Sequence, residues 1–190
     1  MGGGTSGDAG GGARGEQVRL VPYGDGDLWL LRRYNSPEMT EHLGGPETEE
    51  KLLARHQRYL DLAVGGMFRV VLAGSGETVG SIGFWEHEWR GGTVWETGWA
   101  VLPEFQRRGL AVRAARAVAE AARDAGRHRY LHAFPKVDHA ASNGVCRRAG
   151  FTLLGPVEFE YPKGNPITSN DWRLDLTDGR PDGTPDAQDA

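Results

Sequence analysis

Residues 99–112 place a strand, a turn and the start of a helix in one continuous stretch. The strand leads through Pro103 into a basic turn, Gln106-Arg107-Arg108-Gly109. Glycine lets a backbone approach a ligand closely because it has no side chain. The free amide groups at a helix N-terminus, aided by the helix dipole, favour anions. The stretch therefore predicts a site for phosphate or pyrophosphate at the start of a helix over 107–125.

The segments around this stretch predict a sheet with helices on both faces. Short apolar runs bounded by turn residues indicate strands, and apolar residues at helical spacing indicate helices. In chain order we expect a strand at 18–21, helices at 25–34 and 48–63, strands at 68–73, 78–85 and 93–101, the helix at 107–125, a strand at 129–134, a helix at 140–149, and strands at 151–161 and 170–176. This order is typical of an α/β (α+β) fold, with a mixed central sheet of about six or seven strands flanked by four helices.

Composition narrows the classes of function. Residues 1–15 contain eight glycines and residues 178–190 are polar, so we expect disordered tails on either side of one domain at 16–177. A net charge of −4 and a single cysteine argue against a nucleic-acid-binding surface, a disulfide framework and a cysteine-rich metal site. No apolar run approaches the roughly 20 residues of a membrane-spanning helix. We expect a cytoplasmic protein with no metal and no membrane partner.

Two motifs resemble those of one enzyme family. Gln106-x-x-Gly109-x-Ala111 is similar to the turn that holds the pyrophosphate of acetyl-CoA in the GNAT superfamily of N-acetyltransferases. About 30 residues later, a second motif is similar to that of the RimJ/RimL branch, and its matching residues are Ala141, Ser142, Val145, Arg148, Gly150 and Phe151. The resemblance covers 18–176 and implies the GNAT fold, acetyl-CoA as co-substrate and a set of cofactor-binding residues: Trp99, Ala100, Val101, Arg107, Arg108, Gly109, Leu110, Ala111, Val112 and Asn143. Arg113 is a further candidate, for the 3′-phosphate.

The chain also departs from the family's patterns. Three residues before Ser142, where the family usually has Asn, this chain has His139. The RimI-type protein acetyltransferases use a Glu and a Tyr at positions that correspond here to Phe134 and Cys146. Neither of these side chains can do the work of a base, so that mechanism does not transfer.

The implied reaction, attack of an amine on a thioester, needs a base and a proton donor. Glu96 lies on the motif strand, three residues before Trp99, and we expect it to be the base. The resemblance places Ser142 where it can protonate the leaving thiolate, and it places the oxyanion donor among the backbone amides of residues 99–101. Other candidates for the base remain open, on the neighbouring strand and near the last strands: Glu86, His87, Glu88, Glu160 and Tyr161.

We therefore expect an N-acetyltransferase that moves the acetyl group of acetyl-CoA to a primary amine, on a small molecule or on a protein N-terminus. The acidic balance of the chain favours a cationic acceptor. Two alternatives stay open, a CoA-binding sensor without turnover and a transferase of another acyl group such as succinyl. The sequence also leaves open whether the protein is a homodimer.

Overall fold

The computed structural model describes residues 16–160, 164 and 166–177. The predicted tails at 1–15 and 178–190 lie outside the described residues. The described strands form one seven-stranded sheet in the order β1-β2-β3-β4-β5-β7-β6. Their bounds are β1 (Val18–Pro22), β2 (Gly65–Leu72), β3 (Thr78–Trp89), β4 (Gly92–Val101), β5 (Tyr130–Ala133), β6 (Thr152–Glu160) and β7 (Pro166–Asp175). Only β4 and β5 pair in parallel, so the expected mixed sheet is confirmed.

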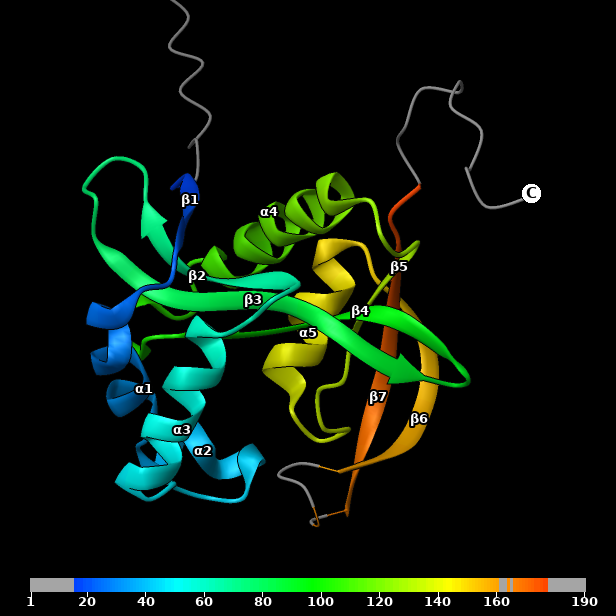
Figure 1. Cartoon of the computed structure of the whole chain (residues 1–190), viewed down its shortest axis with the longest axis horizontal. Coiled ribbons are helices and arrows are strands. Elements are labelled where there is room, and N and C mark those ends of the chain that lie inside the picture. The colour runs from blue at the N-terminus through cyan, green and yellow to red at the C-terminus, as the bar shows by residue number, and fades with distance from the viewer. Residues whose placement is uncertain (1–15, 161–163, 165, 178–190) are drawn as a thin grey trace, which may run out of the picture.

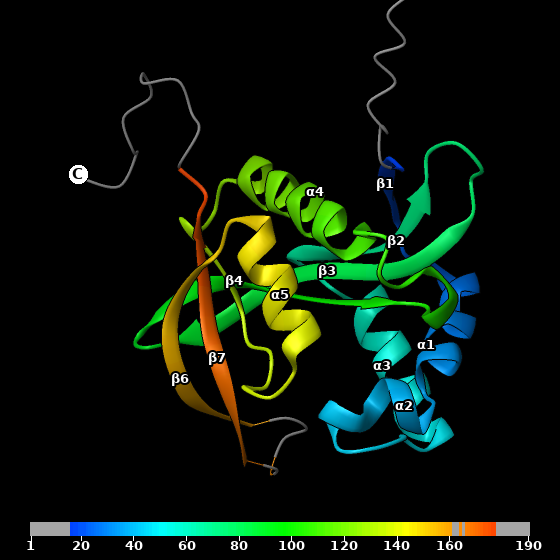
Figure 2. The same ribbon diagram turned by 180° about the vertical axis from the view of Figure 1, so that it is seen from behind.

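The helices lie on both faces of this sheet (Figures 1 and 2). Their bounds are α1 (Leu28–Tyr34), α2 (Pro37–Thr40), α3 (Glu49–Leu60), α4 (Leu110–Ala125) and α5 (Ala140–Ala149). The first three lie together on one side of the long β3 strand, while α4 lies on the other side and packs against α5. The four predicted helices are present, and the single turn of α2 is an addition that the sequence reading missed.

The sheet separates in its middle. β4 and β5 pair only at Trp95 with Leu131 and at Glu96 with His132. Beyond Glu96, β4 continues to Val101 with hydrogen bonds to β3 alone. Helix α5 lies beside this separation (Figure 2). The last five residues of β4 therefore have one strand edge that no other strand of the described chain covers.

Helix α4 packs on the face of the sheet opposite α1, α2 and α3. Its buried stripe is Leu110, Ala114, Val118 and Ala122, as the helical spacing of these residues predicts, and each is at most 1% exposed. The small alanine side chains let the helix approach β1, β2, β3 and β4 closely. This packing fixes the N-terminus of α4 beside the end of β4.

Of the boundaries that differ from those predicted, two bear on the site. Strand β3 continues four residues past the predicted end, through Glu86 to Trp89, because β4 pairs with it along its whole length. Helix α4 begins at Leu110 and not at Arg107, because Arg107 (φ 63°) and Gly109 (φ 76°) have left-handed backbones that no α-helix accepts.

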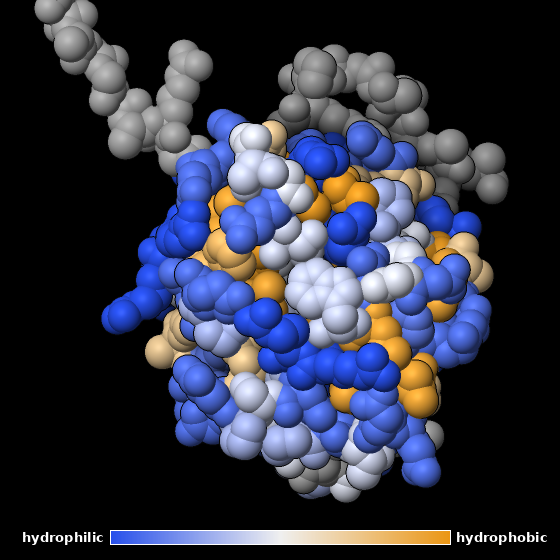
Figure 3. Space-filling model, turned by 90° about the vertical axis from the view of Figure 1, so that its left-hand side faces the viewer, coloured by the Kyte–Doolittle hydropathy of each residue, from blue (hydrophilic) through white to orange (hydrophobic). Residues whose placement is uncertain are grey.

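The surface on the side of β1, α1 and α3 is mostly hydrophilic, with small apolar patches between charged side chains (Figure 3). Among the described residues, no helix combines the length and the hydropathy needed to cross a membrane.

We predict that the stretch 16–177 folds by itself, because it contains all seven strands and the core that α4 covers. A chain shortened to Glu16–Thr177 should melt within about 2 °C of the full chain in a calorimetric scan. A shorter chain that starts at Val18 serves as a comparison. It loses the exposed ion pair between Glu16 and Arg108, a type of pair worth about 0–1 kcal/mol, and the hydrogen bond that the Ala73 amide donates to the Gln17 carbonyl. A large drop in melting temperature for the 16–177 chain would contradict these boundaries.

Candidate active site

A cavity of about 1050 Å³ opens where β4 and β5 separate. Its lining residues form two groups. One group comes from the end of β4, the turn after it and the start of α4, and the other comes from α1, α2, α3, β3 and Glu96. Helix α5 and the segment before it also contribute to the lining, through His139, Ser142, Val145 and others. The cavity thus joins the predicted anion turn to the predicted base.

The turn before α4 is shaped to hold an anion. Gln106 is extended and its Nε2 donates to the carbonyl of Val101 at 3.0 Å, which ties the turn to the end of β4. Arg107 and Gly109 then take left-handed backbones, and no side chain caps the helix N-terminus. The first amides of α4 therefore lack partners within the helix and carry its positive dipole end.

Space for a ligand is open directly above this turn. A Cβ built onto Gly109 would meet no atom within 4 Å. Next in the first turn, the Nε of Arg113 is buried with no hydrogen-bond partner in the described part of the chain. Open space and free amides fit a phosphate-bearing ligand, while Arg113 itself does not belong to the described lining of the cavity.

Most predicted cofactor residues line the cavity. On β4 these are Trp99, Ala100 and Val101, which lie on the part of the strand that β5 leaves uncovered, and after the turn they are Arg107, Gly109, Leu110, Ala111 and Val112. The strand offers backbone amide and carbonyl groups to an extended ligand in the way it would offer them to another strand.

Glu96 reaches the cavity from β4, on the same face as Gly98 and Ala100. Directly opposite on β3 stands Trp85, whose Nε1 donates to Glu96 Oε2 at 3.2 Å. The Trp85 ring lies against Gly98, since a Cβ there would come within 3.1 Å of it. The absence of a side chain at Gly98 thus lets the indole lie across the strand and hold the carboxylate.

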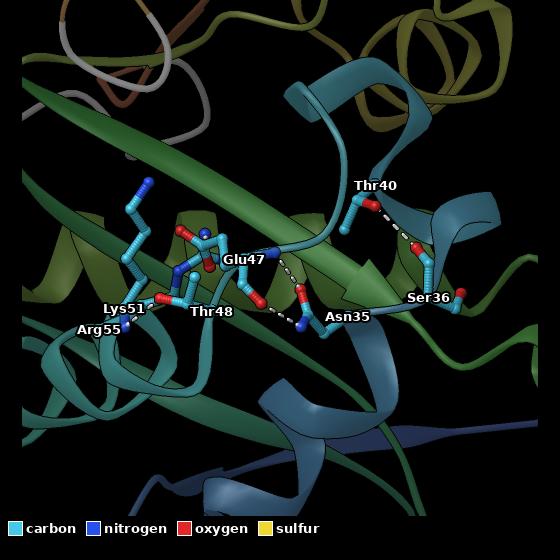
Figure 4. A network of polar contacts seen from close by, with 7 residues as sticks. All are labelled: Asn35, Ser36, Thr40, Glu47, Thr48, Lys51 and Arg55. Atoms are coloured by element: carbon cyan, nitrogen blue, oxygen red, sulfur yellow. Dashed lines mark hydrogen bonds and ion pairs between the residues drawn. The ribbon is translucent and has the colours of Figure 1, made fainter.

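The second wall of the cavity comes from α2 and the short 3-10 turn after it. Sequence reading missed this wall, although Ser36 before Pro37 is a helix-start signal: the Ser36 hydroxyl accepts from the Met39 amide at 3.2 Å. Figure 4 shows how the wall is braced. Asn35 exchanges two hydrogen bonds with the backbone of Glu47, at 2.8 and 2.7 Å, and Arg55 of α3 pairs with the Glu47 carboxylate at 2.5 Å.

This wall meets α5 through histidines. The ring of His42 stacks on that of His139 with centroids 4.2 Å apart, and His42 Nδ1 lies 3.3 Å from Asp138. His139 is the N-cap of α5, although its side chain makes no capping bond. The carboxylate of Asp138, one residue before it, pairs with His42. Both His42 and His139 line the cavity.

Comparison with known proteins identifies the architecture. An acetyltransferase (GNAT) domain model matches residues 17–152, about 70% of the chain. The chain belongs to the GNAT acetyltransferase family.

Solved structures agree with this assignment at the level of the fold. A GNAT-family acetyltransferase from Bacillus anthracis has 21% identity and a TM-score of 0.69, over 86% of this chain and 97% of that one. RimL, the ribosomal L7/L12 alpha-N-protein acetyltransferase in complex with coenzyme A, has 20% identity and a TM-score of 0.67, over 84% and 94%. The aminoglycoside acetyltransferase AAC(6')-Ib with paromomycin and acetyl-CoA has 19% identity and a TM-score of 0.69, over 88% and 100%. No curated protein matches the chain significantly in sequence.

Two of the predicted cofactor residues turn away from the cavity of this GNAT acetyltransferase. The Arg108 guanidinium pairs with Glu16, with Nε 2.9 Å from Oε2, and lies over the ring of Phe105. Its side chain is therefore engaged elsewhere, and only its backbone belongs to the anion turn.

The Asn143 side chain forms hydrogen bonds inside the protein. Its Nδ2 donates to the carbonyls of Lys136 and His139 at 2.8 and 2.9 Å. Its Oδ1 accepts from Asn170 and Trp172, both at 2.8 Å. The side chain is buried and does not line the cavity, so it fastens the start of α5 to β7. The neighbouring Ser142 does line the cavity, and Asn143 holds it there.

Among the carboxylates considered for the base, Glu96 is the one that the described structure brings to the cavity. Glu86 pairs with His128 at 2.9 Å and with Arg127 at 3.2 Å, and these contacts, the His128 bond first, hold its pKa below the usual range. Glu88 accepts from the Thr93 hydroxyl. Neither of the two lines the cavity. Glu160 ends β6 but its side chain is not described, and Tyr161 lies outside the described residues.

Burial shifts the pKa values of Glu96 and Cys146. Desolvation raises the pKa of Glu96 to about 7, against the hydrogen bond from Trp85, which lowers it. A carboxylate with a pKa near 7 accepts a proton more readily than an exposed one and is half ionised at neutral pH. Burial also raises the pKa of Cys146 to about 12, so this thiol stays neutral. Within the described residues, no cluster of His, Cys, Asp and Glu could hold a metal ion.

We predict that Gly109→Glu abolishes tight acetyl-CoA binding, because it puts a negative charge into the open space above the anion turn. The affinity measured by calorimetry should fall by more than about tenfold, since charges at a helix end act through the same dipole that attracts the ligand. Gly126→Glu is the matched control, because Gly126 is also left-handed (φ 66°) and lies at the other end of the same helix. Equal affinities of the two folded variants would contradict the assignment of the turn.

We also predict that Glu96→Gln stabilises the protein at high pH. The folded-state pKa of Glu96 is raised from 4.5 to about 7, so the native state binds more protons than the unfolded chain between these values. The wild-type protein therefore loses stability as pH rises from about 4.5 to 7, and Gln escapes that loss. Urea unfolding should show the variant more stable by about 1–3 kcal/mol at pH 8 and equal to the wild type at pH 4. A pH-independent difference would contradict the raised pKa.

Proposed function

We propose that this GNAT protein transfers the acetyl group of acetyl-CoA to a primary amine of a cationic small molecule or of a protein N-terminus. The observation that carries the proposal is the mostly buried Glu96 carboxylate, which lines the same cavity as the anion turn before α4. The structural neighbours include a protein N-terminal acetyltransferase with coenzyme A and an aminoglycoside acetyltransferase with acetyl-CoA.

The part of the cavity formed by the end of β4, the turn after it and the start of α4, here called the cofactor half, suits acetyl-CoA. The amides of Leu110, Ala111 and Val112 and the left-handed Gly109 would hold the pyrophosphate. The uncovered edge of β4, at residues 99–101, would hydrogen-bond the extended arm. When bound, acetyl-CoA supplies an acetyl group that the thioester activates toward amines.

The other part of the cavity, formed by α1, α2, α3, β3 and Glu96 and here called the acceptor half, supplies the proton transfers. An alkyl ammonium has a pKa of roughly 10, so little free amine exists at neutral pH. Glu96 takes the ammonium proton and leaves a nucleophilic nitrogen lone pair. A backbone amide among residues 99–101 stabilises the oxyanion that develops. The Ser142 hydroxyl on α5 then gives a hydrogen bond or a proton to the departing thiolate.

The charges of the acceptor half support a cationic substrate. Glu38, Glu41 and Asp138 line the same cavity as Glu96. Four Lys and Arg residues also belong to the lining: Arg55 pairs with Glu47, Lys136 lies 3.8 Å from Asp138, Arg107 belongs to the anion turn, and Arg148 lies in the last turn of α5. Carboxylates at the mouth of a cavity raise the local concentration of cations.

The role of Glu96 predicts the kinetics of Glu96→Gln. With a panel of polyamines, aminoglycosides and N-terminal peptides, kcat should fall by about 10²–10⁴-fold while the KM for acetyl-CoA stays near that of the wild type. In the wild type, kcat/KM should rise with pH through about 7, the pKa of Glu96, and this limb should vanish in the variant. Glu86→Gln is the matched control, since its carboxylate lies away from the cavity.

The effect of Ser142→Ala should be smaller than that of Glu96→Gln, because water can protonate a thiolate of pKa near roughly 8.5. Near wild-type turnover of Glu96→Gln across the pH range would show that Glu96 is not the base. An absence of thiol release with every amine of the panel would show instead that the protein binds CoA without turnover.

A further inference from the structure

His87, in the part of β3 that extends beyond the predicted strand, contacts the carboxylate of Glu96. Its Nδ1 lies 3.3 Å from Oε2, the same oxygen that accepts from Trp85 Nε1. Within the described part of the chain, Oε1 of Glu96 has no hydrogen bond. One carboxylate oxygen is therefore held from β3 at two points, and the other is left for the cavity.

His87 contacts a residue of the cavity lining but does not belong to that lining. Glu96 and Trp85 both line the cavity, and His87 does not. Its side chain is nonetheless 28% exposed, against 16% for Glu96. The imidazole therefore contacts the carboxylate without belonging to the described lining of the cavity.

The surroundings of His87 hold it in place and disfavour its charged form. Its ring packs against Phe134 and Trp89, at centroid distances of 5.6 and 5.9 Å. Burial lowers the pKa of His87, and the nearby His132 lowers it further, while Glu88 on its own strand raises it.

His132 belongs to a buried pair that reaches to β7. Its Nδ1 lies 2.7 Å from Asp171 Oδ1, and Asp171 Oδ2 also accepts from Trp89 at 3.0 Å. Burial opposes ionisation of Asp171, yet the contacts with His132, Trp89 and Arg90 keep its pKa below the usual value. The groups that face His87 are thus Glu96 on β4, Glu88 on β3, and His132 on β5 with Asp171 behind it.

We propose that His87 is a positioning residue for the base: with the Trp85 indole it holds Oε2 of Glu96, so that Oε1 faces the acceptor amine. This proposal rests on the proposed role of Glu96. An ionised carboxylate can only accept hydrogen bonds, so the active state requires a proton on His87 Nδ1. A proton on Nδ1, at its distance of 3.3 Å from Oε2, favours the ionised form of the carboxylate over the protonated form.

Two nearly isosteric variants test the proposal. His87→Leu removes the polar contact, and His87→Asn keeps a donor near the place of Nδ1 without a titrating group. For His87→Leu we expect kcat at pH 7 to fall about tenfold, as for the loss of a hydrogen bond to a charged group. The acid limb of kcat/KM should move up by about one pH unit, and the KM for acetyl-CoA should not change. His87→Asn should keep the position of the limb within about 0.3 unit and most of the rate.

A double variant separates this inference from the proposed function. In the Glu96→Gln background, His87→Leu should have no further effect on kcat, because His87 acts only through the carboxylate. An unmoved acid limb in His87→Leu, or equal losses in the Leu and Asn variants, would overturn the role of His87 and leave Glu96 as the base. Full activity of Glu96→Gln would overturn both proposals together.

Discussion

The short parallel pairing of β4 and β5 is the constraint on which the rest of the site depends. The two strands share two residue pairs and then separate, so five residues of β4 keep one uncovered edge. An uncovered strand edge offers hydrogen-bonding groups that would otherwise be paired within the sheet. The cavity forms in this separation, and α5 holds it open from the side because Asn143 fastens that helix to β7.

The same separation divides the chemistry between the two ends of the cavity. Positive charge gathers at the start of α4, where the helix dipole adds to Arg107, which has no ion pair within the described residues. Negative charge gathers at the other end, where Glu96 is buried against Trp85. Burial of a carboxylate costs stability, and the same burial raises its pKa into the range where a base is useful at neutral pH. The loss of stability and the raised pKa of Glu96 thus have one physical origin.

The parts of the site that local sequence determines could be predicted from the sequence. The turn at 106–109 follows from glycine and helix-start chemistry, and strand alternation places Glu96 on the face of Ala100. The directions of the side chains could not be predicted in this way. Arg108 lies next to Gly109 in sequence, but its side chain pairs with Glu16, 92 residues away. The side-chain oxygen of Asn143 accepts a hydrogen bond from Asn170 of β7. No neighbouring residue in the sequence reveals such distant partners.

The sequence by itself determined the family, the mixed sheet, the anion turn and the nomination of Glu96, because each depends on residues close together along the chain. Only the tertiary structure decided which nominated residues meet. It extended β3 past Trp85 because β4 pairs with that polar segment, and so it brought His87 to the carboxylate. It also built the second wall of the cavity from α2, since Asn35 and Glu47 bind across 12 residues. Contacts between distant segments arise from packing and strand register, which local pattern does not encode.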